Sequence, residues 1–337
     1  MTAYSFGSRS YGRPKETKWR YRFSILTVLS TVALIAWGGF VTSIGAGMAV
    51  PDWPASFGSF DPFRTGFHDP TDPAAQWWHS VPILAEHGHR LLGMLVGLFT
   101  MRLAGGTWMK DPRRWMRWLG VAALVLVIAQ GILGGLRVVY ISMDLAVVHA
   151  CVAQIFFAMI VAMTLFTSRW WMQPRVPPVE AGKLRKLRIL AGITIGVLYI
   201  QIILGALLRH PGASIDQTLA ILHITGAFVC TIAIAALVVY IRRHFAAEKL
   251  LKTASSIIVG VLIIQLTLGF TAYFVILDEA GVLQPSNFQV IVNSAHLVVG
   301  SFLFATAASI GIISMRSHRE PALADQQASR PQKATIR

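Results

Sequence analysis

Long apolar runs decide what this chain can fold into. A helix needs about 20 mostly apolar residues to cross a hydrocarbon core about 30 Å thick. Eight runs reach that length, and they cover residues 23–44, 83–103, 118–139, 145–167, 187–208, 218–241, 254–277 and 290–315. Because lipid cannot satisfy free peptide groups, each run should be helical, with irregular backbone confined to the connections. We therefore expect an all-α integral membrane protein with eight transmembrane helices.

The composition agrees with a chain whose main solvent is lipid. Hydrophobic residues make up 55% of the sequence and charged residues 13%, whereas a soluble domain carries about 25% charged residues. The net charge of +15 lies between the apolar runs rather than along one polar face, which disfavours a nucleic-acid partner. The two cysteines, Cys151 and Cys230, lie inside apolar runs, so neither a disulfide framework nor a cysteine metal site is expected.

Lysine and arginine gather in alternate connections. Both tails and the second-to-third, fourth-to-fifth and sixth-to-seventh connections hold 26 of the 30, and the others are Arg64, Arg90, Arg137 and Arg209. Since basic residues stay on the cytoplasmic side, both termini are predicted to be cytoplasmic. The basic residues 1–22 lead into a full-length span rather than a cleavable signal, so a bacterial cell (plasma) membrane is predicted.

An internal repeat runs through the predicted helices. Three spans contain Gln-x-x-x-Gly, and the span that follows each opens with a histidine: Gln130, Gly134 and His149; Gln201, Gly205 and His223; Gln265, Gly269 and His296. The first pair of spans fits more loosely, with Gly38-Gly39 and then Glu86-His87-Gly88-His89-Arg90. Taken alone, Gln-x-x-x-Gly is a helix-packing pattern. Its repetition predicts two pseudo-repeated four-helix bundles.

The repeat also predicts how the chain is divided. A basic cytoplasmic tail covers residues 1–22, and the N-terminal four-helix half covers 23–167. A cytoplasmic linker at 168–186 leads to the C-terminal half at 187–315, and a disordered cytoplasmic tail at 316–337 ends the chain.

Histidines near the outer end of the even-numbered spans form two candidate pairs. Those spans are parallel, so their histidines share one depth, and parallel helices lie diagonally across a four-helix bundle. His89 with His149, and His223 with His296, are therefore candidate metal ligands that hold a planar metallocofactor from both sides. Zinc needs about four converging ligands, whereas two imidazoles suit heme. A helix-packing hydrogen bond is the structural alternative for each histidine.

Glu86 is the candidate catalytic acid. It precedes His89 by three residues, hence on the same helix face, and a carboxylate beside a metal centre can move protons or orient substrate. The alternatives are a residue that frays into water and a counter-charge for Arg90. The positions that match Glu86 in the other spans hold Ala146, Ala220 and Asn293, so the two halves are chemically unequal.

Two more features surround these candidates. Arg90, Arg137 and Arg209 end helices near the histidines, where they could bind heme propionates or extend to the membrane interface. The outer connection between the first two spans is about 40 residues long and rich in Trp, Phe and Pro. Connections of that length are often lids, while interfacial aromatic belts are the alternative.

The pattern resembles the heme A synthase family of cytochrome oxidase assembly proteins. The segments that carry the resemblance span nearly the whole chain outside the tails: Val41-Thr42-Ser43, Ala46 to Pro54 with Pro51-Asp52-Trp53-Pro54, Glu86-x-x-His89-Arg90, Leu133-Gly134-Gly135, Leu204 to Ala213, and the four histidines. The resemblance implies a heme-dependent oxidoreductase that converts the methyl of heme O to the formyl of heme A. The formyl oxygen would come from dioxygen or water.

The resemblance also implies roles for residues. His223 and His296 would ligate heme b as the cofactor, His89 and His149 would face the substrate heme O, and Glu86 would be essential. Some members carry cysteines around the Pro-Asp-Trp-Pro loop, but Val50, Ala55 and Ser56 stand here, so a loop disulfide is not transferred.

Three other functions would each explain part of the pattern. A non-catalytic bis-histidine diheme b electron-transfer protein explains the histidines but gives Glu86 no task. A transporter should have interrupted helices near the midplane, and the prenyltransferase that makes heme O should have aspartate clusters for magnesium; the sequence shows neither. The expected partners are membrane lipid, an electron donor or acceptor that the sequence does not identify, and a heme O synthase that hands over an insoluble heme.

Overall fold

A computed structural model describes residues 15–69, 71–172, 180–209, 216–278 and 285–316. Most of the predicted basic tail, part of the predicted linker and the predicted disordered tail beyond Arg316 lie outside the described residues. Within them the chain is helical and contains no strand. Eight helices of these described ranges are long and apolar enough to cross a membrane. The predicted all-α membrane fold with eight spans is confirmed.

The long helices contain the predicted apolar runs almost completely. Their bounds are α1 (Lys15–Ser43), α2 (Val81–Lys110), α3 (Arg114–Val139), α4 (Met143–Thr167), α6 (Ala181–Arg209), α7 (Gln217–His244), α8 (Lys249–Asp278) and α9 (Asn287–Arg316). Most extend past the apolar run by one turn or more, because Lys and Arg stems can continue a helix into the headgroup region. Two short helices were not predicted: η1 (Trp77–His79) and α5 (Arg169–Met172).

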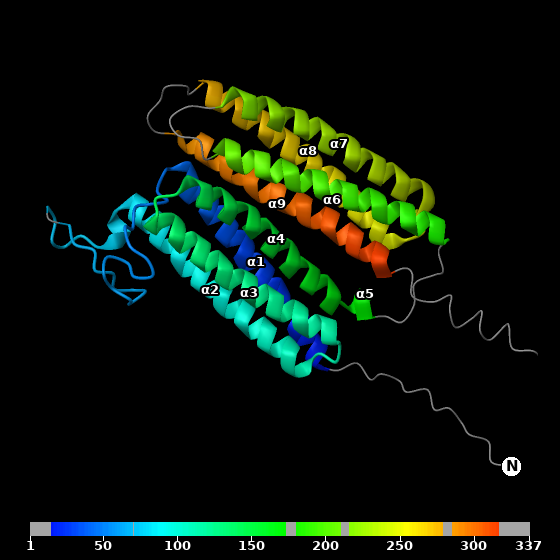
Figure 1. The fold of residues 1–337 in the computed structure, drawn as a ribbon, viewed down its shortest axis with the longest axis horizontal. Helices are drawn as coiled ribbons and strands as arrows, with labels where there is room; N and C mark the ends of the chain where they lie inside the picture. Colours follow the sequence, from blue (N-terminus) through cyan, green and yellow to red (C-terminus); the bar gives the residue numbers. More distant parts are fainter. Residues whose placement is uncertain (1–14, 70, 173–179, 210–215, 279–284, 317–337) are drawn as a thin grey trace, which may run out of the picture.

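The long helices form two four-helix bundles that lie side by side (Figure 1). In each bundle, helices that follow one another in the chain pack together, and the first packs on the last: α1 on α4, and α6 on α9. In the described part of the chain, α2 does not pack on α4, nor α7 on α9. These are therefore the diagonal pairs, as the repeat predicts. The bundles meet where α9 packs on α1 and α4.

Apolar side chains fill each bundle and also cover its outside. The C-terminal bundle buries Leu187, Ile234 and Ile258 completely, and Phe157 and Ala305 are buried where the two bundles meet. Many large apolar side chains on the outer helix faces are exposed. An apolar outside around an apolar core is the pattern expected of helices that face lipid.

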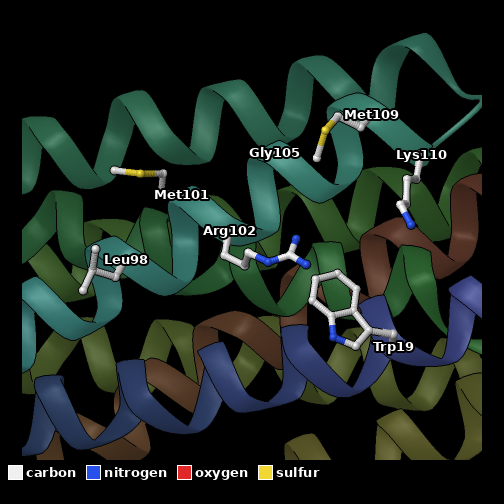
Figure 2. Close-up of a pocket in the computed structure, with 7 residues that line it drawn as sticks. All are labelled: Trp19, Leu98, Met101, Arg102, Gly105, Met109 and Lys110. Carbon is white, nitrogen blue, oxygen red and sulfur yellow. The ribbon is translucent and has the colours of Figure 1, made fainter.

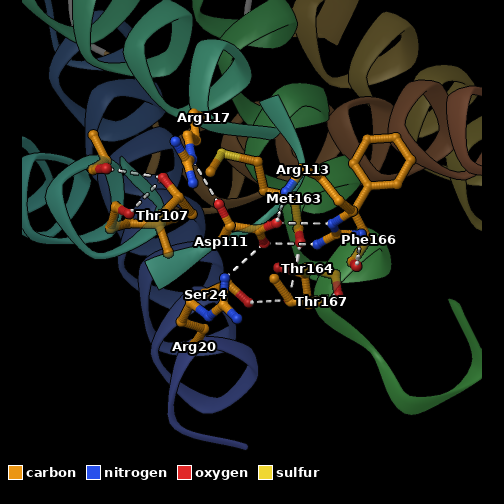
Figure 3. A network of polar contacts seen from close by, with 12 residues as sticks. Arg20, Ser24, Thr107, Asp111, Arg113, Arg117, Met163, Thr164, Phe166 and Thr167 are labelled. Carbon is orange, nitrogen blue, oxygen red and sulfur yellow. Dashed lines mark hydrogen bonds and ion pairs between the residues drawn. The ribbon is translucent and has the colours of Figure 1, made fainter. Parts of the chain in front are cut away.

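A buried ion-pair cluster lies at the end of the N-terminal bundle where α2 meets α3 and lysine and arginine gather, which we call the basic end (Figure 3). Asp111, between α2 and α3, accepts hydrogen bonds from Arg20 (2.6 Å) and Arg113 (2.8 Å). Arg113 also donates to the Phe166 carbonyl in α4. Burial alone would raise the pKa of Asp111, but the hydrogen bonds and charges of the two arginines lower it. The cluster joins three parts of the bundle about 33 Å along α2 from His89.

Candidate functional site

Each of the four predicted histidines packs on a helical glycine of the preceding helix. A Cβ atom on Gly134, Gly205 or Gly269 would lie 3.3, 3.0 and 3.0 Å from Cε1 of the histidine of the same hairpin, which is His149, His223 or His296 respectively. Gly38 and His89 form the same contact at 2.9 Å. The first hairpin therefore shares the glycine–histidine contact of the other three, and the glycines leave room for the rings.

A glutamine amide also lies against three of the rings. Gln201 Nε2 is 3.1 Å from His223 Nδ1 and donates to the His223 carbonyl at 2.7 Å. Gln265 Nε2 is 3.2 Å from His296 Nε2. The Gln130 amide nitrogen can donate to His149 Nδ1 at 3.0 Å. This role was not predicted from the sequence, although the Gln-x-x-x-Gly spacing indicates it, since a residue four before a glycine faces the same neighbouring helix.

The first hairpin has no such amide. Leu34 stands four residues before Gly38, and His89 Nδ1 is buried with no hydrogen-bond partner among the described residues. Each of the four histidines thus packs on its own glycine. The sites differ in whether a glutamine amide bonds to the ring.

His223 and His296 face each other across the C-terminal bundle. Their ring centroids are 6.3 Å apart and the ring planes are inclined by 71°. Two imidazoles on one metal, each with a bond of about 2 Å, would place their ring centres about 6 Å apart. His296 Nδ1 is buried and has no partner in the described chain. Two facing imidazoles at this separation fit the axial positions of a heme.

A zinc site does not fit the same residues. Among the described residues, no group of three or more His, Cys, Asp or Glu side chains could hold a metal ion. Structural zinc needs four protein ligands and catalytic zinc three. The two pairs therefore fit heme better than zinc.

His89 and His149 come together in the N-terminal bundle in a different setting. They lie within electrostatic range of each other, and His89 also lies within range of Arg90 and Arg137. Glu86 lies within range of Arg137. This end of the bundle therefore combines two histidines, two cations and one carboxylate, whereas Asn293 stands at the position of Glu86 in α9.

Glu86 is buried and both of its carboxylate oxygens are bonded. Oε1 pairs with Arg90 Nη2 at 2.8 Å, and Oε2 accepts the backbone N–H of Val50 at 2.8 Å. Of the two structural alternatives, fraying into water is excluded and pairing with Arg90 is observed. Glu86 therefore joins α2 to the outer connection.

Arg90 holds that connection along several residues. Its guanidinium donates to the backbone carbonyls of Asp52 (2.7 Å), Ala55 (3.0 Å) and Val50 (3.0 Å). The Asp52 carboxylate accepts the N–H groups of the two residues 57 and 58. Burial would raise the pKa of Asp52, but these backbone hydrogen bonds and the charge of Arg90 lower it. The Pro-Asp-Trp-Pro segment is thus fixed beside Glu86.

Two further contacts attach the connection to the site. The Trp53 ring lies against Gly135, where a Cβ atom would be 2.1 Å from Trp53 Cδ2. His87 is buried. Its Nδ1 is 3.2 Å from Ser56 Oγ, and its Nε2 donates to the Pro62 carbonyl at 2.9 Å. Trp53 therefore contacts Gly135, which follows Gly134, the residue that contacts His149. The predicted lid function of the connection stays a prediction.

The other two predicted arginines also contact backbone carbonyls near the histidines. Arg137 Nη2 donates to Gly47 at 2.9 Å. Arg209 Nη2 donates to the Gly39 carbonyl and to Ser43 Oγ, both at 2.7 Å, and Nη1 donates to the Asn293 carbonyl at 3.2 Å. Arg209 therefore links the C-terminal bundle to α1. Propionate binding by Arg90, Arg137 and Arg209 stays a prediction.

Comparison with known proteins identifies the family of the chain. The family described as cytochrome oxidase assembly protein (COX15-CtaA) matches residues 21–222. A heme A synthase of Geobacillus kaustophilus (strain HTA426) is 24% identical over 96% of this chain and 99% of its own length. One of Alkalihalophilus pseudofirmus is 26% identical over 57% of this chain and 60% of its own length. A heme A synthase of Methylobacterium sp. (strain 4-46) is 26% identical over 66% of this chain and 65% of its own length. These matches confirm the resemblance found in the sequence. The chain belongs to the cytochrome oxidase assembly protein family.

Proposed function

We propose that the chain is a heme A synthase, which converts the methyl group of heme O to the formyl group of heme A for cytochrome oxidase assembly. The names of the similar proteins support it. The observation that carries it is the inequality of the two histidine sites. Only the pair His89 and His149 lies beside the buried Glu86–Arg90 ion pair.

The C-terminal bundle holds the resident cofactor, heme b, with His223 and His296 as axial ligands. The separation and the buried setting of the two rings support this assignment. A heme b bound there supplies one-electron redox chemistry. The Gln201 amide contacts Nδ1 of His223 and leaves Nε2 for the iron, whereas the Gln265 amide contacts Nε2 of His296 and would turn away from that nitrogen when the heme binds.

The N-terminal bundle takes heme O as substrate, with His89 and His149 facing it. Glu86 is the acid–base residue, and its carboxylate is kept in place by Arg90 and the Val50 N–H. The connection from Gly47 to Ser56, held by Arg90 and Arg137, covers the substrate and keeps bulk water away. Propionates of the two hemes are bound by the arginines at this end: Arg90, Arg137 and Arg209.

The membrane placement follows from charge. We propose a multi-pass protein of the cell membrane with both termini in the cytoplasm and both heme sites toward the extracytoplasmic face. Heme O reaches the chain from a heme O synthase, and an electron carrier of the membrane exchanges electrons with heme b.

The alternative is a non-catalytic diheme b electron-transfer protein. The two histidine pairs favour it as much as they favour the enzyme. It gives no task to the Glu86–Arg90 pair or to the connection that this pair holds.

Extraction of hemes from membranes that contain the chain and a heme O synthase separates the two functions. A heme A synthase yields heme A or its hydroxylated precursor, and the Glu86→Ala variant leaves heme O unchanged while it keeps heme b. Heme b together with unchanged heme O in the wild type, with the electron donor present, would identify the electron-transfer protein instead.

A further inference from the structure

A groove lies between α1 and α2 near the basic end of the N-terminal bundle, away from every histidine site (Figure 2). Its volume is 690 Å³, and it is lined by Trp19, Leu98, Met101, Arg102, Gly105, Met109 and Lys110. Arg102 lies 13 residues after His89 on α2, which corresponds to about 20 Å along the helix axis. The groove is therefore separate from the proposed heme sites.

The described residues that line the groove are cationic or apolar, and none of them carries a carboxylate. The Arg102 guanidinium lies over the Trp19 ring, 4.2 Å from the ring centroid. Figure 2 shows Arg102 reaching toward Trp19 between the two helices. Leu98 and Met101 supply apolar walls on one side of Arg102, and Lys110 ends the groove on the other.

The groove crosses the level where a membrane meets water. Trp19, Trp108 and Trp118 are exposed at this end of the bundle, and exposed tryptophans mark the headgroup level. From Lys110, at the end of α2, to Leu98 the helix rises about 18 Å. The cationic end therefore lies among headgroups, while the apolar end reaches the level of acyl chains.

We propose that this groove binds one anionic phospholipid, with its phosphate at Arg102 and with an acyl chain along Leu98 and Met101. The arrangement of charge and apolar surface is complementary to such a lipid. Basic pockets between transmembrane helices bind anionic headgroups in this way. Zwitterionic lipids fill the apolar part but lack the net charge that Arg102 selects.

Two variants test the charge and the shape of the groove separately. Arg102→Gln removes the charge, and its control is Arg114→Gln, which removes an exposed arginine at the start of α3 outside the groove. Gly105→Leu fills the groove and keeps Arg102, because no atom lies within 4 Å of a Cβ at Gly105 and the new side chain has room there. Its control is Gly192→Leu, on an exposed face of α6 with the same open surroundings.

The measurement is native mass spectrometry of the purified full chain with equal amounts of phosphatidylglycerol and phosphatidylcholine of matched acyl chains. The wild type should carry one phosphatidylglycerol in preference to phosphatidylcholine. Arg102→Gln should weaken phosphatidylglycerol binding by about fivefold, and Gly105→Leu should abolish it. Both controls should bind like the wild type.

Three results would overturn the proposal. The first is equal phosphatidylglycerol binding by wild type and Arg102→Gln. The second is an equal loss in Arg114→Gln, which would assign the binding to general surface charge. The third is displacement of the lipid by a large excess of glycerol phosphate, which would identify a site for free phosphate. Heme b content, measured by absorbance, should stay unchanged in all four variants and serves as the check that they fold.

Discussion

Gly269 in α8 lies directly against the ring of His296 in α9, and a Cβ atom there would be 3.0 Å from Cε1 and 3.6 Å from Nδ1. A ring held by a metal bond cannot move away from an added side chain. Gly269→Val should therefore lower heme b occupancy by about tenfold. Gly260→Val is the matched control, since it changes an exposed glycine of the same helix with nothing within 4 Å. Heme content per protein, read by absorbance, tests this, and equal content in the two variants would contradict the assignment.

The amide of Gln201 makes a second prediction about the same cofactor. Gln201→Leu removes the group that lies 3.1 Å from His223 Nδ1 but leaves Gly205 and the ring in place. Loss of a group that orients a ligating histidine commonly lowers metal affinity 10- to 100-fold. We expect weaker heme b binding and a shifted reduction potential with the bis-imidazole spectrum retained. An unchanged reduction potential and an unchanged heme b affinity would show that the Gln201 amide packs on the His223 ring without orienting it.

The fold and the histidine pairs could be predicted from the sequence because both follow from periodic features. Span length sets the helices, and one histidine per returning span places His223 opposite His296. The surroundings of Glu86 could not be predicted in this way. Glu86 meets Val50, and His87 meets Ser56 from 31 residues earlier, through the path of an irregular connection. That path depends on backbone carbonyls that Arg90 binds, and carbonyls carry no signature in a sequence.

A substitution at Glu86 can distinguish a role of its carboxylate in the reaction from its role in anchoring the outer connection. Glu86→Gln can still accept the Val50 N–H but loses the charge that faces Arg90 and cannot exchange a proton. If Glu86 is the acid–base residue, heme A formation should fall about 100-fold or more, while the heme b spectrum stays unchanged. Chromatography of extracted hemes and absorbance of the purified protein measure the two effects. Normal heme A yield in Glu86→Gln would leave Glu86 only its role as an anchor.

The Asp111 cluster predicts how stability depends on pH. The folded pKa of Asp111 is lowered, so its carboxylate stabilises the fold above its unfolded pKa, near 4, and loses that effect as pH falls through the folded value. Asp111→Asn leaves Arg20 buried without its partner and should cost about 3–5 kcal/mol. The melting temperature should therefore drop by a constant amount from pH 5 to 8, and the difference should shrink only below about pH 4.

A control for that measurement lies in the outer connection. Asp61 has a lowered pKa because the backbone N–H groups of Phe63 and Arg64 bond to it, but it is exposed. Asp61→Asn should change the melting temperature little at any of these pH values. A difference between Asp111→Asn and wild type that disappeared already at pH 6 would contradict the lowered pKa.

The contact between Trp53 and Gly135 tests whether the outer connection must be docked for the reaction. A methyl group at Gly135 would overlap the Trp53 ring, only 2.1 Å from Cδ2, so Gly135→Ala should displace the Pro-Asp-Trp-Pro segment from the helices. Gly131→Ala, one turn earlier on an exposed face of α3 with open space around it, is the control. We expect Gly135→Ala to lower heme A formation and to make the connection more sensitive to protease, with heme b retained.

Because Ala favours helix over Gly by about 1 kcal/mol, a loss seen only in Gly135→Ala would come from the displaced tryptophan rather than from a weakened helix. Full heme A yield in a variant with a protease-sensitive connection would mean that the docked connection is dispensable.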